Sequence, residues 1–261
     1  MKLFMHGKMK RDFILLSLWG LYIILTVTIF WRNNTLTGTL VVLGSAGLLF
    51  SWRSLKNFAI FFVAGLLGFT CEYIFTAKMH YYHYNNPSTI ILSRAFTITT
   101  FPWWLFFVWG YIIIIFIHLA YLMEEVIRSL TSGKHVSIRK IFMVPLWIIM
   151  IVYFILVYKE VNFDFTKWFI IPIVFMIILW HRDVDIILFF VSAIFGTLGE
   201  WVCIQNGVWT HNFHYSYYGF MEGLPLSLPL VWGSLTVLLS RLPTLFVKGA
   251  IGLFPGKQKS G

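Results

Sequence analysis

The chain has 261 residues, of which 59% are apolar and only 11% are charged; its mean hydropathy is +0.81 and its formal net charge is +10. Soluble domains carry about 25% charged residues, so this composition excludes a water-soluble domain and predicts an integral membrane protein. The positive charge then reflects topology and attraction to anionic membrane lipids, and nucleic acid is not expected as a partner.

Eight apolar segments are predicted to cross the membrane, because a span needs about 17 to 25 residues. In chain order they occupy residues 13–31, 36–52, 57–77, 101–123, 141–158, 167–180, 186–206 and 224–240. The second and sixth segments are the shortest.

The chain repeats itself at an offset of 128 residues. Five pairs share this offset: Trp52 and Trp180, Gly68 and Gly196, Glu72 and Glu200, Tyr81 and Trp209, His83 and His211. A block that runs from Pro102 to Trp109-Gly110 also returns, as Pro225 to Trp232-Gly233. The predicted fold is therefore an all-α membrane bundle of about eight helices, built from two four-helix repeats at residues 1–130 and 131–261. Because four is an even number, the repeats are expected to be parallel, related by an axis along the membrane normal.

Lysine and arginine predict the orientation. The N-terminus, the connections after the second, fourth and sixth spans, and the C-terminal tail carry 15 of these residues, and the other four connections carry 5. This bias predicts a protein of the cytoplasmic membrane with both termini cytoplasmic. The segments 78–98 and 207–223 would then face the extracytoplasmic side.

Glu72 and Glu200 are the candidate catalytic residues. A carboxyl group within an apolar span costs several kcal/mol unless it is paired, protonated or in contact with water. A low dielectric favours the neutral acid, which could donate a proton. Gly68 and Gly196 lie one helical turn earlier and predict close helix packing beside each carboxyl group. The alternative is that each glutamate only holds neighbouring helices together.

Four histidines are candidate metal ligands: His80, His83, His211 and His214. Together with the two carboxylates they have the donor types of a zinc or non-haem iron site. Glu72 and His80, however, are separated by about 12 Å of helix, so the chain would have to turn back after the span. A divalent metal is therefore left open, and the alternative is a belt of interfacial histidines and aromatic residues.

Aromatic residues and histidines near the outer ends of the spans are the candidate substrate-binding residues: Tyr81, Trp109, Trp209, Trp232, His83 and His211. The indole rings either pack between helices or line a cavity and stabilise positive charge on a bound molecule.

The second half resembles the integral-membrane carotenoid biosynthesis family that includes the carotenoid hydratases. The resemblance covers about forty residues, in the order Gly196, Glu200, Gly207, Tyr215 or Tyr217, Gly223-Leu-Pro225 and Pro229-Leu-Val-Trp232. The first half carries it only in part, since Ala77 or Lys78 stands in place of a glycine and no glycine precedes Pro102.

The resemblance implies a hydrophobic substrate, a long polyene or polyisoprenoid in the bilayer. A protonated Glu200 or Glu72 would act as general acid on an alkene, and aromatic rings would stabilise the cation. No soluble cofactor would be required. Three functions remain open: such an enzyme, a small transporter with proton-carrying glutamates, or a membrane scaffold.

Overall fold

The structure is a computed structural model, and it describes most of the chain outside one long internal segment. The described residues are 7–78, 80, 82–88, 90–93, 96–98, 100–130, 183–211, 224 and 228–253, without the side chains of 90–98, 183, 211 and 242–253. The fifth and sixth predicted spans, 141–158 and 167–180, lie outside this part, and so do Tyr81, Trp180 and His214.

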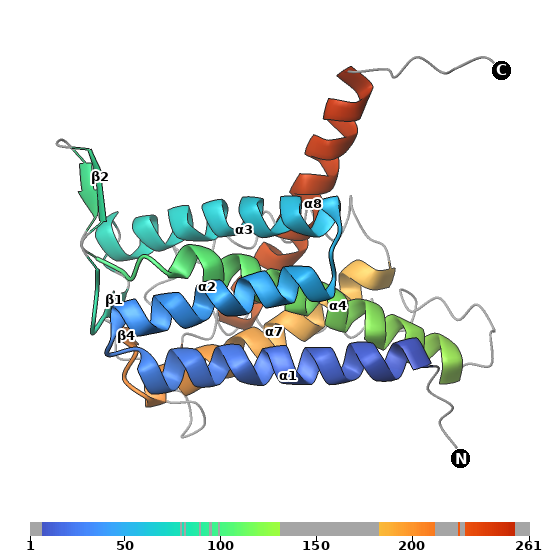
Figure 1. Cartoon of the computed structure of the whole chain (residues 1–261), viewed down its shortest axis with the longest axis horizontal. Coiled ribbons are helices and arrows are strands. Elements are labelled where there is room, and N and C mark those ends of the chain that lie inside the picture. The colour runs from blue at the N-terminus through green and yellow to red at the C-terminus, as the bar shows by residue number, and fades with distance from the viewer. Residues whose placement is uncertain are drawn as a thin grey trace, which may run out of the picture.

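Six α-helices form the described bundle (Figure 1). They are α1 (Gly7–Phe30), α2 (Asn34–Ser51), α3 (Leu55–Tyr73), α4 (Leu105–Leu130), α7 (Asp183–Gln205) and α8 (Leu228–Leu253). Five of the described helices are long and apolar enough to cross a membrane, and the stretch Leu228–Arg241 of α8 is apolar but shorter. The prediction of a helical protein with membrane-compatible spans is thus confirmed at this level.

Local signals explain where the first helices begin. Asn33 caps α2, its side chain accepting a hydrogen bond from the backbone N–H of Leu36 at 3.0 Å. Ser54 caps α3 in the same way, with the N–H of Asn57 at 3.0 Å. Such caps satisfy helix-terminal N–H groups that have no partner within the helix. The connections between the first three helices can therefore be short.

The fourth helix differs from its predicted limits of 101–123. It begins at Leu105, whose N–H donates to the Pro102 carbonyl in the preceding turn at 3.2 Å, and it continues to Leu130. Pro102 therefore lies before the helix and not in its first turn.

Short strands lie at one end of the bundle, a feature that the all-α prediction did not include. A π-helical turn, η1 (Ile74–Lys78), continues α3 and leads to β1 (Tyr82–Tyr84). The strand β1 pairs antiparallel with β4 (Trp209–His211), and β2 (Ile90–Ser93) pairs with β3 (Phe96–Ile98). Aromatic and β-branched residues dominate these segments and favour extended backbone.

The helices α3, α4, α7 and α8 pack against one another in the order α3–α4–α7–α8–α3, with α1 and α2 packed against α4. The helices α3 and α4 approach each other closely where two glycines face backbone carbonyls. A Cβ atom on Gly110 would lie 2.6 Å from the Phe61 oxygen, and one on Gly65 would lie 2.7 Å from the Phe106 oxygen. Only glycine allows backbones to approach this closely.

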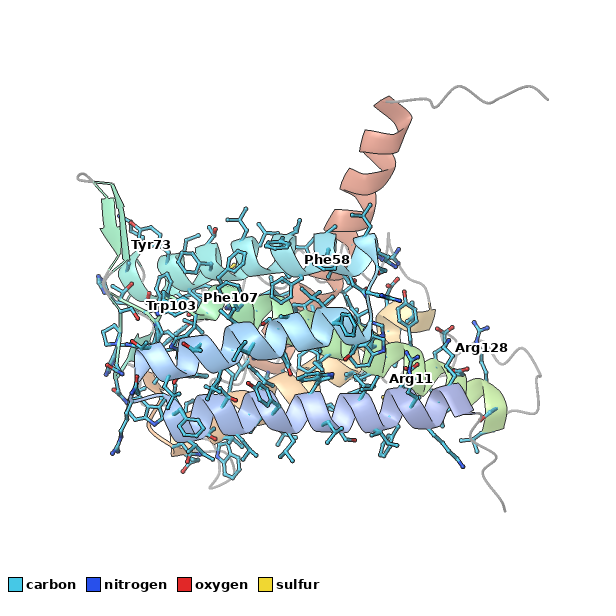
Figure 2. All side chains as sticks on the ribbon, in the orientation of Figure 1. Arg11, Phe58, Tyr73, Trp103, Phe107 and Arg128 are labelled. Carbon is cyan, nitrogen blue, oxygen red and sulfur yellow. The ribbon has the colours of Figure 1, made fainter. Side chains whose placement is uncertain are left out.

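The ends of the bundle differ in composition. Arg11 and Arg128 lie at the end away from β1 and β4, whereas Tyr73 and Trp103 lie near the strands (Figure 2). We refer to the end that carries β1 and β4 as the strand end.

We expect Gly110→Ala to destabilise the bundle by about 1–3 kcal/mol, because the new methyl group would overlap the Phe61 carbonyl. Thermal unfolding of the purified protein in detergent would measure this as a lowered melting temperature. Gly20→Ala is the matched control, since a Cβ there meets no atom within 4 Å. Equal melting temperatures for the two variants would contradict the close contact between α3 and α4.

Candidate functional site

Glu72 lies in the last turn of α3, is only 4% exposed, and accepts three hydrogen bonds. Its Oε2 atom accepts from the hydroxyl groups of Tyr82 at 2.5 Å and Tyr84 at 3.0 Å. Its Oε1 atom accepts from the indole Nε1 of Trp109 on α4 at 3.0 Å. Both carboxyl oxygens therefore have partners despite their burial.

The chain turns back after α3 to bring these tyrosines to Glu72. Within the π-helical turn η1, the Thr76 hydroxyl donates to the Glu72 backbone carbonyl at 2.7 Å. Successive side chains of a strand point to opposite faces. Tyr82 and Tyr84 therefore share the face toward Glu72, while the exposed His83 lies on the other.

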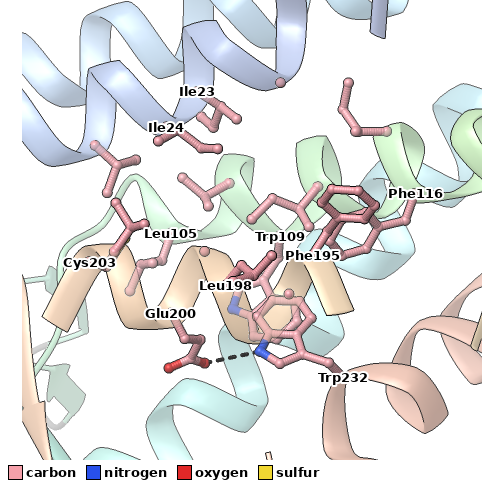
Figure 3. A pocket seen from close by; sticks show the side chains of 18 of the residues that line it. Ile23, Ile24, Leu105, Trp109, Phe116, Phe195, Leu198, Glu200, Cys203 and Trp232 are labelled. Carbon is pink, nitrogen blue, oxygen red and sulfur yellow. Dashed lines mark hydrogen bonds between the residues drawn. The ribbon is translucent and has the colours of Figure 1, made fainter. Parts of the chain in front are cut away.

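Glu200 has a similar environment near the end of α7. Its Oε2 atom accepts from Trp209 Nε1 at 3.2 Å, and its Oε1 atom accepts from Trp232 Nε1 on α8 at 3.3 Å (Figure 3). Unlike Glu72, the Glu200 side chain is only half-buried, and its donors within the described part of the chain are both indoles.

A glycine turn directs Trp209 back toward Glu200. Gly207 has φ +72, a conformation that favours glycine, and it follows the last residue of α7 closely. The N–H of Gly207 donates to the Ile204 carbonyl at 2.9 Å and that of Val208 to the Cys203 carbonyl at 3.0 Å. This pair of bonds is a Schellman motif, which ends the helix and reverses the chain.

The two carboxyl groups are joined through a pair of stacked indoles. Trp109 and Trp232 lie with ring centroids 5.0 Å apart and an interplanar angle of 21°. Each donates its N–H to a different glutamate. Gly68 on α3 and Gly196 on α7 leave room for these rings, because a Cβ on either would overlap the adjacent indole.

The strand pair holds the two halves together at this end. His83 is opposite Thr210, and Tyr84 is opposite Trp209. The Asn85 side chain adds a hydrogen bond to the Gly207 carbonyl at 2.7 Å. Residues more than 120 positions apart thus fix the positions of the Tyr and Trp donors.

A cavity of about 530 Å³ reaches both carboxyl groups. Residues of α1, α4 and α7 form most of its wall, which is predominantly apolar, and Glu72 also lines it. Glu200 and Trp232 lie next to each other in this wall (Figure 3). Several lining residues are also exposed at the surface of the bundle, among them Phe13 at 55% and Phe195 at 49%. The cavity therefore opens sideways.

The candidate residues from the sequence fall into two groups. Glu72, Glu200, Trp109, Trp209 and Trp232 come together around this cavity. His83 faces away from it, His80 lies in the turn before β1 with φ +51, and His211 is placed only by its backbone in β4. Tyr81 and His214 are outside the described residues.

Metal ligands do not cluster in the part of the chain that the structure describes, where no group of three or more His, Cys, Asp or Glu side chains could hold an ion. The glutamate oxygens accept from N–H and O–H groups instead. Nor does either carboxyl group form an ion pair with a described residue.

Sequence reasoning missed Tyr82 and Tyr84 as partners of Glu72, and it missed the contribution of α1 to the cavity. The alternating Tyr-His-Tyr pattern of residues 82–84 was an available signal for a strand that places both tyrosines on one face. Ser17 and Gly20 of α1 had no such signal, since isolated small residues are common in membrane helices.

Comparison with models of known protein families, with curated proteins and with solved structures finds no match for this chain. The geometry of the site therefore carries the functional argument.

Alkaline pH is expected to destabilise the protein through Tyr82 and Tyr84. Burial, followed by the nearby Glu72 charge, raises the pKa of both phenols above the ordinary value of about 10. The unfolded chain ionises these phenols near pH 10 and the folded chain does not. Their contribution to stability is therefore complete below pH 10 and is lost as the pH rises above it.

Melting temperatures from about pH 9 to 11 would measure this loss. The Tyr82→Phe/Tyr84→Phe double variant should show a flatter decline than the wild type. Tyr121→Phe, which removes an exposed phenol, should decline like the wild type. Parallel curves for wild type and double variant would rule out the buried phenols as the cause.

Proposed function

We propose that this protein is an integral-membrane enzyme that protonates a carbon–carbon double bond of a long isoprenoid or similar lipid. The observation that carries the proposal is the apolar cavity with two carboxyl groups and stacked indoles at one end. An apolar pocket with a few convergent polar groups is the usual form of a small-molecule site.

The reaction begins with transfer of a proton from a neutral carboxylic acid to one alkene carbon. The π electrons form the new C–H bond, the other carbon becomes a tertiary cation, and the acid becomes a carboxylate. The faces of nearby aromatic rings stabilise the cation. Addition of water with loss of a proton gives an alcohol, and loss of a proton alone gives a rearranged alkene. Neither outcome requires a soluble cofactor.

Glu200 is the proposed proton donor, because its side chain is half-buried at the cavity wall and, among the described residues, its hydrogen-bond partners are two indoles. Glu72 is almost fully buried, and three donors occupy its oxygens. We assign Glu72 to fixing the positions of Trp109 and the tyrosines, and so the shape of the cavity end.

The resemblance to the carotenoid hydratases agrees with this assignment. Gly196, Glu200 and Trp232, three residues that carry it, are in mutual contact in α7 and α8. A polyene with a terminal isoprene unit would provide the double bond.

We also infer that the two halves are parallel repeats. Gly68 packs on Trp109, which donates to Glu72, and Gly196 packs on Trp232, which donates to Glu200. The register of β1 and β4 agrees with this repeat, because replacing each paired residue by its equivalent 128 positions away gives another observed pair. That offset converts the pair Tyr82 and His211 into the pair Thr210 and His83, which is also observed.

The same inference extends to the topology. The first residues of α1 and the arginines Arg11 and Arg128 lie away from the strands (Figures 1 and 2). The excess of basic residues then places that end in the cytoplasm and the carboxyl groups toward the opposite face of the cytoplasmic membrane.

Transport and scaffolding receive less support. A proton-coupled transporter needs carboxyl groups that contact water, and the cavity wall here is mainly apolar. A scaffold would need no cavity beside its buried carboxyl groups.

Glu200→Gln should lower product formation by about 100-fold or more, because the amide cannot act as the acid. The measurement is a mass-spectrometric lipid and pigment profile of a strain that lacks the gene, complemented with wild type or variant at equal protein levels. Glu124→Gln is the control, since Glu124 lies at the far end of α4 in an ion pair with Arg128. Wild-type product levels with Glu200→Gln would refute the proposed acid.

A further inference from the structure

We propose that the substrate is an uncharged, single-chain lipid that enters sideways from the bilayer between α1 and α7, through a portal held open by Gly20 and Gly199. This inference rests on the proposed function for the reaction, but it concerns binding and can be tested separately.

The shape of the cavity fits one extended chain. The residues of α1 that line it run from Phe13 to Val27, which corresponds to about 21 Å of helix. Val27 lies toward the strand end, near the carboxyl groups, and Leu119 of α4 lines the other end together with Phe13. A chain bound along α1 would place its terminus at Glu200.

The opening lies between two helices that hardly touch each other. The helix α1 packs mainly on α2 and α4, and its contact with α7 is slight. On the α1 side, Ile24 lines the cavity and is 43% exposed; on the α7 side, Leu198 lines it and is 36% exposed. Because both side chains are apolar, the opening matches the interior of a bilayer and not water.

Two glycines border this opening, and close packing does not require glycine at either position. A Cβ on Gly20 or Gly199 would meet no atom of the described residues within 4 Å, although both residues line the cavity. By contrast, a Cβ on Gly44 or Gly47 of α2 would overlap an aromatic ring of α1. The space beside Gly20 and Gly199 belongs to the cavity, and a larger side chain would occupy it.

The charge of the cavity wall determines which lipids can bind. Among the residues that the structure describes, the cavity wall contains no Lys, Arg or His side chain, and it contains Glu72 and Glu200. A phosphate or diphosphate group would lose its hydration there without gaining a cationic partner. The site therefore favours a hydrocarbon or an alcohol over a phospholipid or a prenyl diphosphate.

The test uses the purified full-length chain in phosphatidylcholine nanodiscs and a geranylgeraniol analogue with a diazirine at the tail. After photolysis, peptide mass spectrometry should locate the label on α1 and α7, in the cavity wall. Gly20→Leu and Gly199→Leu should each reduce labelling by about tenfold, equal to about 1.4 kcal/mol of binding free energy. Gly7→Leu is the control, because Gly7 also has open space but lies outside the cavity wall.

Unlabelled geranylgeraniol should compete with the probe, and geranylgeranyl diphosphate should not. Equal competition by the diphosphate would overturn the uncharged class. Wild-type labelling of both leucine variants, with melting temperatures showing that they are folded, would overturn the portal.

The same variants separate this inference from the proposed function. Glu200→Gln should still be labelled in the cavity, because the portal does not use its carboxyl group. Blocked labelling in the leucine variants, with unchanged lipid profiles for Glu200→Gln, would retain the portal and reject the acid. Loss of product in Glu200→Gln, together with wild-type labelling of the two leucine variants, would retain the acid and reject the portal.

Discussion

The burial of two carboxyl groups in an apolar helical bundle is the constraint on which the rest of this structure depends. A carboxyl group without a partner in a low-dielectric environment costs several kcal/mol, so each oxygen needs a donor. Indole N–H and phenol O–H groups meet this need while adding large apolar surfaces to the bundle. Among the described residues, the donors to Glu72 and Glu200 are Trp and Tyr side chains and not Arg or Lys.

Bulky donors in turn require small neighbours. Gly68 and Gly196 leave space for the rings of Trp109 and Trp232, and the stacking of these rings brings α4 and α8 together at one place. The cavity beside the stack is consequently shaped by both halves of the chain and by α1. A change in one glycine would therefore alter hydrogen bonding at the carboxyl groups as well as helix packing.

Much of the architecture was predictable because membrane insertion imposes a strong compositional pattern, and α1, α2, α3, α4 and α7 appear where hydropathy places them. The equivalence of Glu72 and Glu200 followed from the offset of 128 residues, and that of Trp109 and Trp232 from the second repeated block, in which the offset is 123; both relate positions without any knowledge of distance. The partners Tyr82 and Tyr84 could not be found in this way. Their positions depend on a π-helical turn and on pairing with a strand more than 120 residues away; the Tyr-His-Tyr alternation indicates a strand but identifies neither the turn nor the partner strand.

The pairing of β1 with β4 has a consequence for biosynthesis. The strand that presents Tyr82 and Tyr84 to Glu72 gains its partner only after Trp209–His211 has been synthesised. Until then the strand that carries Tyr82 and Tyr84 has no partner strand, and Trp109 lacks the indole on which it stacks. Contacts of such large sequence separation form late. The first half therefore completes neither polar centre by itself, and both centres become ordered only after the residues through Trp232 have been synthesised.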